Sequence, residues 1–371
     1  MLTNKELDFV FVTDLHIRNT EKYGKIGPTG RNTRLDDKFS HINSSVSYCI
    51  DNSCDMWICG GDVFDKINPA ENLRNLFFDC ITPLIEKGIP IYIVVGNHDT
   101  DSQIYSFMTE EKLFKTLAKD DTIKIIAEPV KETIKGNDFL FIPWVPDDQV
   151  SYHLRQHQDC IVVGHFGVNG SKVGPSEYML SSGISPKLFQ KHRIGILGHY
   201  HKYQWYDNSN WGYIGSISRV DFSERDDEKY FAHFTSRSEE LAITKKLVNV
   251  NDRRFFQHNI YEKDDSKFEE LLKWDESMLK DAVVKLVFIG EENWYLSFNP
   301  SEIKNKILKL CKAHKLFIEH LTKSSGRFMM PEINLNSDWS EGIELHCAAK
   351  KKPEMIELGK KILMEVQSNE S

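Results

Sequence analysis

Five short polar segments, each directly after an apolar and β-prone run, constrain the fold of this chain more than any other feature. They read V-T-D-L-H at residues 12–16, G-G-D-V-F-D at 60–65, G-N-H-D at 96–99, G-H at 164–165 and G-H-Y-H at 198–201. The exits of strands are the places where an α/β sheet builds its functional site. We therefore predict an α/β fold in which the five segments meet at one edge.

Seven side chains within these segments offer ligands to metal ions. They are Asp14, His16, Asp62, Asn97, His165, His199 and His201. A mixture of carboxylate, amide and imidazole ligands suits a pair of first-row divalent cations better than calcium or a thiolate-bound structural zinc. We expect Asp62 to bridge two ions with its two carboxylate oxygens. One ion would be completed by Asp14, His16 and His201, and the other by Asn97, His165 and His199.

A paired-metal site of this composition predicts the hydrolysis of a phosphate ester. Two ions about 3.5–4 Å apart lower the pKa of a water between them and share the charge that develops on the phosphoryl oxygens. His98 is expected to reach the leaving-group side and donate a proton, with Asp65 or Asp99 holding its imidazole. The alternative for His98 is a turn histidine that only packs over the site.

A further stretch carries a more specific sequence pattern, Y-I-G-S-I-S-R-V-D-F-S-E-R at residues 213–225. Together with V-T-D-L-H and G-G-D-V-F-D, it resembles the SbcD-type nucleases, bacterial and phage counterparts of the meiotic-recombination-eleven nuclease, within the calcineurin-like metallophosphoesterases. The resemblance implies a layered β-sandwich flanked by helices and a manganese-dependent DNA nuclease of replication, recombination and repair. It also implies 3′ to 5′ exonuclease action on duplex ends and endonuclease action on single strands or hairpins. Many archaeal and eukaryotic members carry a histidine where this chain has Asp65, so the role of that histidine cannot be transferred.

Two other functions remain open. The same two-metal chemistry serves phosphodiesterases and phosphatases that act on nucleotides or other small phosphate esters. A scaffold that kept the fold and lost catalysis is disfavoured, because all seven expected ligands are present. Mn²⁺ is the ion implied by the resemblance, although Mg²⁺, Fe²⁺ and Zn²⁺ bind overlapping ligand sets.

The order of apolar and amphipathic runs predicts three parts. Residues 1–235 form the nuclease domain, 236–335 a small α/β capping domain that the resemblance places over the DNA, and 336–371 a helical tail. Within the first part, strands are expected at 7–12, 56–59, 89–95, 139–145, 160–164, 194–198 and 211–217, and helices near 35–52, 70–87 and 102–118. In the second, strands are expected at 282–289 and 315–322, with a helix at 301–314.

The resemblance also implies partners. The tail would bind an SMC-like ABC ATPase of SbcC type, and the alternative is an amphipathic helix that packs on its own domain. The helices near 70–87 and 102–118 would form a homodimer interface, although the apolar stripe of the first helix would equally pack on its own sheet.

The charge distribution bears on DNA binding. The net charge of −8 is unfavourable for a DNA-binding protein. Residues 18–34, however, carry five basic side chains against Glu21 alone, which predicts either a contact with the DNA backbone or a solvated loop. These side chains are Arg18, Lys22, Lys25, Arg31 and Arg34. A second basic stretch at 301–327 has the pattern of a solvated helix face.

Composition sets the remaining expectations. No apolar run approaches the roughly 18 residues needed to cross a bilayer, and the first residues lack the pattern of a signal peptide, so we expect a cytoplasmic protein. The seven cysteines show no C-x-x-C spacing, which is typical of reduced, buried thiols. A nucleotide-binding glycine motif is absent from the sequence, so nucleotide energy would have to come from a partner.

Overall fold

The structure is a computed structural model that describes residues 6–19, 22–101, 105–106, 122–173, 179–206, 209–237 and 243–322. The predicted helical tail at 336–371 lies outside the described residues. So does most of the predicted helix at 102–118. Within the described residues, no helix is both long and apolar enough to span a membrane.

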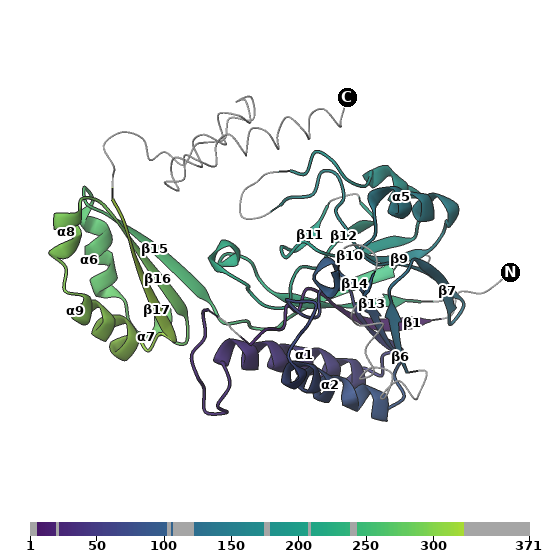
Figure 1. Ribbon diagram of the computed structural model, residues 1–371, viewed down its shortest axis with the longest axis horizontal. Coiled ribbons are helices and arrows are strands. Elements are labelled where there is room, and N and C mark those ends of the chain that lie inside the picture. Colours follow the sequence, from purple (N-terminus) through teal and green to yellow (C-terminus); the bar gives the residue numbers. More distant parts are fainter. Residues whose placement is uncertain are drawn as a thin grey trace.

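Two six-stranded sheets form the body of the molecule (Figure 1). The first sheet has the order β14 (Ile243–Asn249), β13 (Tyr230–Ser236), β1 (Leu7–Val12), β2 (Met56–Cys59), β3 (Ile91–Val94) and β6 (Ile123–Ile126). The second has the order β11 (Gln204–Trp205), β12 (Trp211–Tyr213), β10 (Ile194–Gly198), β9 (Ile161–His165), β8 (Asn137–Ile142) and β7 (Val130–Ile134).

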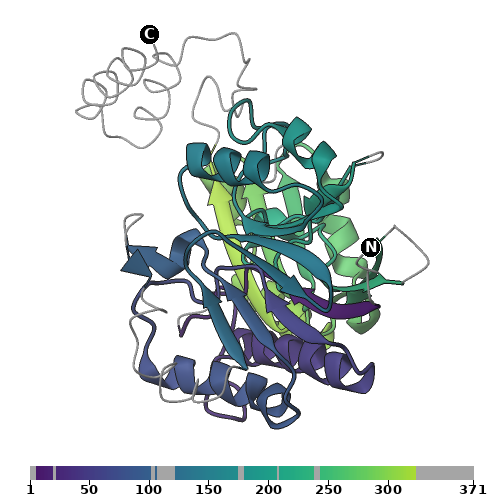
Figure 2. The ribbon, with the colours of Figure 1, turned by 90° about the vertical axis from the view of Figure 1, so that its right-hand side faces the viewer.

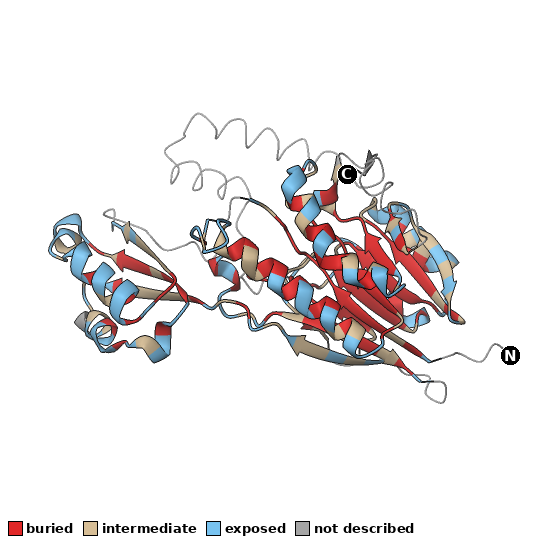
Figure 3. Cartoon of the chain, turned by 90° about the horizontal axis from the view of Figure 1, so that it is seen from below, coloured by how far each residue is buried: buried red, intermediate tan, exposed pale blue. Residues whose placement is uncertain are grey.

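The sheets pack face to face, and helices cover their outer faces. The interface between the sheets is made of alternate apolar side chains, among them Phe9, Phe11, Phe139 and Phe141. Helices α1 (Thr33–Asp51) and α2 (Glu71–Glu86) cover the first sheet, and α5 (Asp147–Gln156) covers the second (Figure 2). Figure 3 shows strands that are buried throughout beneath helices whose outer sides are exposed. The predicted mixed α/β fold with a helix-flanked β-sandwich is therefore confirmed.

The strand directions explain how the motifs come together. β1, β2, β3 and β6 are parallel to one another, as are β8, β9, β10 and β12. The polar motifs follow the carboxyl ends of β1, β2 and β3, or lie at and after those of β9 and β10. Because these ends lie at the same edge of the sandwich, the motifs are brought side by side.

A third sheet forms the smaller part of the molecule, at the left of Figure 1. It consists of the parallel strands β15 (Phe255–Tyr261), β16 (Val283–Ile289) and β17 (Lys315–Leu321). Helices cover one of its faces, namely α6 (Asp265–Lys273), α7 (Glu276–Leu279), α8 (Glu292–Leu296), α9 (Pro300–Lys304) and the π-helical turn Asn305–Leu310. The small unit has one strand more than the sequence predicted.

Several segments differ from the predicted elements, and two of them change a predicted boundary or element type. Strands β4 (Thr100–Asp101) and β5 (Tyr105–Ser106) pair as an antiparallel hairpin where a helix was expected to begin at 102. Strand β14 pairs with β13 along its whole length, so the first sheet extends to Asn249. We therefore place the division between the two parts in residues 250–254 rather than at 235.

Candidate metal centre

Backbone hydrogen bonds tie the first two motifs together. The amide of Asp14 donates to the carbonyl of Gly61 and that of His16 to the carbonyl of Asp62, both at 3.0 Å. The amide of His199 donates to the Asp14 carboxylate at 3.1 Å, which attaches the last motif to the first. Lys38, buried in α1, donates its Nζ to the carbonyl of His16 at 2.6 Å. The motif backbones are thus fixed to one another before any ligand is considered.

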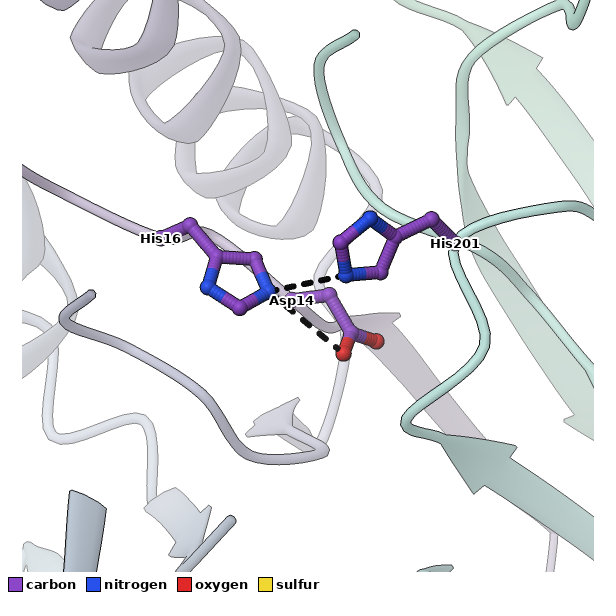
Figure 4. Close-up of side chains that lie close together, drawn as sticks. All are labelled: Asp14, His16 and His201. Atoms are coloured by element: carbon purple, nitrogen blue, oxygen red, sulfur yellow. Dashed lines mark hydrogen bonds and ion pairs between the residues drawn. The ribbon is translucent and has the colours of Figure 1, made fainter. Parts of the chain in front are cut away.

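One group of ligand atoms consists of Asp14, His16 and His201, the residues drawn in Figure 4. The Nε2 atoms of His16 and His201 lie 2.9 Å apart, and His16 Nε2 lies 4.0 Å from Asp14 Oδ1. These are the three side chains that the sequence assigned to one ion besides the bridging aspartate.

A second group surrounds Asn97. Its Oδ1 lies 3.1 Å from His165 Nε2 and 3.0 Å from His199 Nδ1. Asp62 lies between the two groups, because its Oδ2 is 3.4 Å from His165 Nε2 and 3.6 Å from His16 Nε2. All seven side chains proposed as ligands are therefore brought together, with Asp62 in the central position.

The donor set fits a pair of divalent cations. His165 Nδ1 lies 2.8 Å from the carbonyl of Gly60 and donates its proton there, so Nε2 is the atom that faces Asp62 and Asn97 and would bind an ion once a metal displaces its proton. Several hydrogen-bond acceptors thus face one another in a buried space, which is unfavourable unless a cation satisfies them. Mixed imidazole and carboxylate ligands of this kind suit first-row divalent ions.

The electrostatics of the site also favour positive charge. Burial alone would lower the pKa of His165, but Asp62 and Asp14 outweigh it and raise that pKa to about 9. The pKa of His199 is shifted in the opposite direction, because burial and the neighbouring His165 lower it to about 4. The carboxylates therefore create a field that attracts a cation into the centre.

Several of these residues have left-handed backbone conformations. The φ angles are +52° at Asp14, +44° at His16, +52° at Asp62 and +100° at His199. Such angles are unfavourable for residues other than glycine and cluster at functional sites. Gly61 is required next to them, because its φ is +111° and a Cβ there would lie 2.3 Å from His165 Nδ1.

Glu224 is a member of the site that the ligand prediction missed. Its Oε1 accepts a hydrogen bond from His201 Nδ1 at 2.8 Å, so His201 Nε2 is left to face Asp14 and His16. Lys229 Nζ lies 2.6 Å from the other carboxylate oxygen. Burial would raise the pKa of Glu224, but His201 and Lys229 hold it well below its usual range. Carboxylates that orient metal-binding histidines commonly have this arrangement.

His98 lies at the exposed side of the centre. Its ring packs edge-on against that of His16 at 4.8 Å, and it could join His16 and Asp62 around an ion. The residues expected to hold its imidazole act differently. The main-chain carbonyl of Asp65 accepts from His98 Nδ1 at 3.2 Å, whereas the carboxylate of Asp65 faces His16 and Arg18. The Asp99 carboxylate is buried and accepts backbone amides, including that of Gly96 at 3.0 Å.

The basic residues of segment 18–34 are divided between surface and interior. Lys22, Lys25 and Arg31 are exposed, and Arg31 also pairs with Asp36 at 2.7 Å. Arg18 is partly buried beside Asp65. Arg34 is buried and lies 2.9 Å from carboxylate oxygens of both Asp37 and Asp252, so we do not retain it as a DNA contact.

The same segment contacts the smaller sheet. Lys315 Nζ on β17 donates to the carbonyl of Lys22 at 2.7 Å, and the Tyr23 ring packs against Phe222, Phe255 and Phe317. The exposed basic side chains therefore lie on a loop that connects the first motif to the smaller sheet.

Residues 7–203 match the family described as calcineurin-like phosphoesterase. "Exonuclease subunit 1" of Enterobacteria phage T4 is 25% identical over 203 residues, which cover 53% of this chain and 58% of the phage protein. The SbcD component of the nuclease SbcCD of Staphylococcus epidermidis is 22% identical over 291 residues, 69% of this chain and 71% of that protein. Among solved structures, a dimetal phosphatase from Danio rerio aligns with 66% of this chain and 97% of its own, at 11% identity and a TM-score of 0.42.

Proposed function

Because the chain belongs to the calcineurin-like phosphoesterase family, we propose that it is an SbcD-type nuclease that hydrolyses DNA phosphodiester bonds with two bound metal ions. The observation that carries the proposal is the position of Asp62 between two groups of ligand atoms. A carboxylate in that position can bridge two ions, as two-metal hydrolysis requires. The nuclease names of the two relatives support the choice of DNA over other phosphate esters.

The proposed metal ligands are those that the structure brings together. Asp14, His16 and His201 would hold one ion, Asn97, His165 and His199 the other, and Asp62 both. When bound, the ions would supply a water nucleophile near neutral pH and share the charge on the phosphoryl oxygens. We take Mn²⁺ as the metal, on the basis of the SbcD-type resemblance.

The protein groups have separate roles in the proposed reaction. Glu224 accepts a hydrogen bond from Nδ1 of His201, so the Nε2 atom of His201 would be the one that binds a metal ion. The main-chain carbonyl of Asp65 accepts a hydrogen bond from Nδ1 of His98. The Nε2 atom of His98 would therefore be the one that exchanges a proton with the substrate. His98 is exposed, so this nitrogen can donate to the leaving oxygen when DNA is bound. The Asp65 carboxylate positions His16 and Arg18 rather than His98.

DNA would approach along the exposed basic loop. Lys22, Lys25 and Arg31 offer contacts to backbone phosphates, which position DNA without reading its sequence. A cavity of about 250 Å³ adjoins the metal centre, and its lining mixes the basic Lys172 and Lys202 with the acidic Asp221, Glu224 and Asp227. We propose 3′ to 5′ exonuclease action on duplex ends and endonuclease action on single strands.

The relatives are named as parts of larger nucleases, which supports a role within a complex. We propose that the partner is an SMC-like ABC ATPase of SbcC type and that residues 336–371 bind it. A homodimer through the surface near α2, and a capping role for the smaller sheet, belong to the same proposal.

The test is cleavage of end-labelled duplex and single-stranded DNA with Mn²⁺. Bis-p-nitrophenyl phosphate serves as a generic diester, and Asp62→Asn is the inactive control. We expect metal-dependent cutting of both DNA substrates by the wild-type protein. Hydrolysis of the small ester without any cutting of DNA, with or without an SbcC-type partner, would replace the nuclease proposal by a small-substrate phosphodiesterase.

A further inference from the structure

The C-terminal turn of α1 brings two cysteines together near the amino end of β1, away from the metal centre at its carboxyl end. The amide of Cys54 donates to the carbonyl of Cys49 at 2.9 Å, and that of Ser53 to Ile50 at 3.0 Å. Ser53 has a left-handed φ of +52°. These features define a Schellman motif, which places the side chains at its two ends in contact. In Schellman motifs those two positions are frequently apolar, whereas here both are cysteines.

Both thiols are buried and free, with exposed fractions of 0% for Cys49 and 4% for Cys54. The Schellman turn, closed by the hydrogen bond from the Cys54 amide to the Cys49 carbonyl, places the two side chains next to each other. Cys49 Sγ also lies 3.6 Å from the carbonyl oxygen of Met56. The helix end therefore holds the pair in place without a covalent bond.

A histidine and a carboxylate complete the cluster. His233 Nε2 lies 3.8 Å from Cys54 Sγ and 3.3 Å from Asp8 Oδ1. Asp8 and His233 come from the paired strands β1 and β13, whose register matches Val10 with His233. His233 Nδ1 lies 3.3 Å from the Tyr48 hydroxyl, so both ring nitrogens have partners. Cys54 and Asp8 thus face the same nitrogen of His233, where Asp8 favours the protonated imidazole and the protonated imidazole favours a thiolate at Cys54.

The electrostatics agree with this geometry. The Cys49 thiol and His233 lower the pKa of Cys54 to about 6, although burial and Asp8 oppose the change. The hydrogen bond to Cys54 raises the pKa of Cys49, so the second thiol keeps its proton. Because Cys54 is the sulfur that lies beside His233, it is the thiol that we expect to attack, with Cys49 as its neighbour.

We propose that Cys49 and Cys54 form a redox-active dithiol that hydroperoxides convert into a reversible disulfide. The Cys54 thiolate attacks the distal oxygen of the peroxide, the O–O bond breaks, and the released alkoxide or hydroxide takes a proton. Cys54 becomes a sulfenic acid and the peroxide is reduced to an alcohol or water. The Cys49 sulfur then displaces the sulfenic oxygen as water, which forms the S–S bond. A dithiol reductant reverses the oxidation by thiol–disulfide exchange.

Two other buried cysteines provide internal controls. Cys59 lies 3.9 Å from the carbonyl of Gly61, and burial raises its pKa well above the usual value. Cys160 lies 3.3 Å from the carbonyl of Gln158, and burial likewise raises its pKa. The proposal therefore predicts oxidation at one pair and not at these two thiols.

The experiment treats the full-length protein with one equivalent of hydrogen peroxide, then denatures it, blocks free thiols with iodoacetamide and digests it with trypsin. Cys49, Cys54 and Cys59 fall on one tryptic peptide, residues 39–66, which has no internal Lys or Arg. We expect this peptide to take up one alkyl group, at Cys59, and to take up three after treatment with dithiothreitol. Uptake of three groups without reductant, or oxidation of Cys160 at the same rate, would overturn the proposal.

Two variants separate chemistry from packing. Cys49→Ser should stop the reaction at the Cys54 sulfenic acid, which dimedone traps. His233→Asn removes Nε2 but retains a polar group near Tyr48, and it should slow disulfide formation at least about tenfold. Thermal unfolding of both variants checks that they are folded. An unchanged rate in folded His233→Asn, or no dimedone adduct in folded Cys49→Ser, would contradict the proposed activation.

Discussion

The Oε1 atom of Glu224 lies 2.8 Å from Nδ1 of His201, and the opposite nitrogen of that ring lies 2.9 Å from Nε2 of His16. Glu224 thus orients a proposed ligand from outside the ligand set, and Lys229 balances its charge. The site consequently extends to the segment 213–225, beyond the region 7–203 that matches the family.

Glu224→Gln should weaken metal binding. The amide keeps an acceptor for His201 Nδ1 but removes the negative charge that makes the imidazole a stronger ligand. Losses of such partners cost about 10–100-fold in metal affinity or activity. Calorimetric titration with Mn²⁺ measures the effect. The matched control is Asp226→Asn, whose side chain lies two residues further along the chain and is 83% exposed, and equal affinities in the two variants would contradict the assignment.

His98→Asn should lower turnover without a comparable change in metal affinity. Loss of a positioned proton donor costs about 10²–10⁴-fold in rate. Cleavage of labelled DNA gives the rate, and calorimetry with Mn²⁺ gives the affinity. Because His98 is close enough to His16 and Asp62 to share an ion, an equal loss of both quantities would make it a ligand instead. His157→Asn, on the distant end of α5, serves as the control.

Gly61→Ala should disrupt the centre as well as the backbone. The new Cβ would lie 2.3 Å from His165 Nδ1, at a φ of +111°, so His165 has to move. Backbone strain alone is worth about 1–3 kcal/mol of unfolding free energy. Gly88→Ala measures the backbone strain alone, because Gly88 has a φ of +67° and no atom lies within 4 Å of a new Cβ there. We expect urea unfolding to show both losses and Mn²⁺ binding to fall only in Gly61→Ala.

The ionisation of Asp252 should make the free energy of unfolding depend on pH in the acid range. Burial would raise the pKa of Asp252, but Arg34 and His41 outweigh it and the folded-state pKa is lowered. The unfolded value is about 3.9, so the stabilisation is complete well above pH 4 and is lost as pH falls through the folded pKa.

Asp252→Asn should therefore cost about 3–5 kcal/mol at pH 7, since it leaves the buried Arg34 with a weakened ion-pair network. The difference from wild type should shrink as the pH is lowered below 4. Denaturant unfolding across pH 2.5–7 measures both quantities, and a constant difference over that range would rule out the linkage.

The exposed basic loop should control the salt dependence of DNA binding. Replacing Lys22, Lys25 and Arg31 with Gln removes up to three phosphate contacts. The slope of log K against log salt should then fall by about 2–3 for duplex DNA. Fluorescence anisotropy in catalytically inactive Asp62→Asn protein measures the slope without cleavage.

The control for this experiment replaces three lysines in or next to the helices that cover the smaller sheet, the exposed Lys273 and Lys280 and the partly exposed Lys267. The two triple variants lose the same charge. Equal slopes in both would show that net charge, rather than the position of the loop, governs binding.

The sequence predicted which side chains would come together at one edge, because each lies at or after the end of a strand that is apolar and fully buried, such as β2 and β3. Strands with mixed polarity were missed for the same reason. β7 and β14 have no buried residue, so no apolar run marks them. Their positions depend on pairing with partners distant in sequence.

Arg34 and Glu224 could not be assigned from local sequence for a related reason. Arg34 lies among other basic residues in the sequence. In the fold it is buried, and its charge is paired with that of Asp252, which is 218 positions away. Glu224 lies in a polar turn, and only the approach of His201 gives it a role. Both cases depend on tertiary contacts that create buried ion pairs, for which the surrounding residues carry no pattern.

The loop that carries Lys22 and Lys25 follows the first metal motif in the sequence and contacts the smaller sheet. Its Tyr23 ring is held among aromatic side chains of the smaller sheet, and seven residues earlier His16 lies at the metal centre. Since Tyr23 packs against Phe255 and Phe317, any displacement of the smaller sheet relative to the two large sheets would carry the exposed basic side chains of this loop with it.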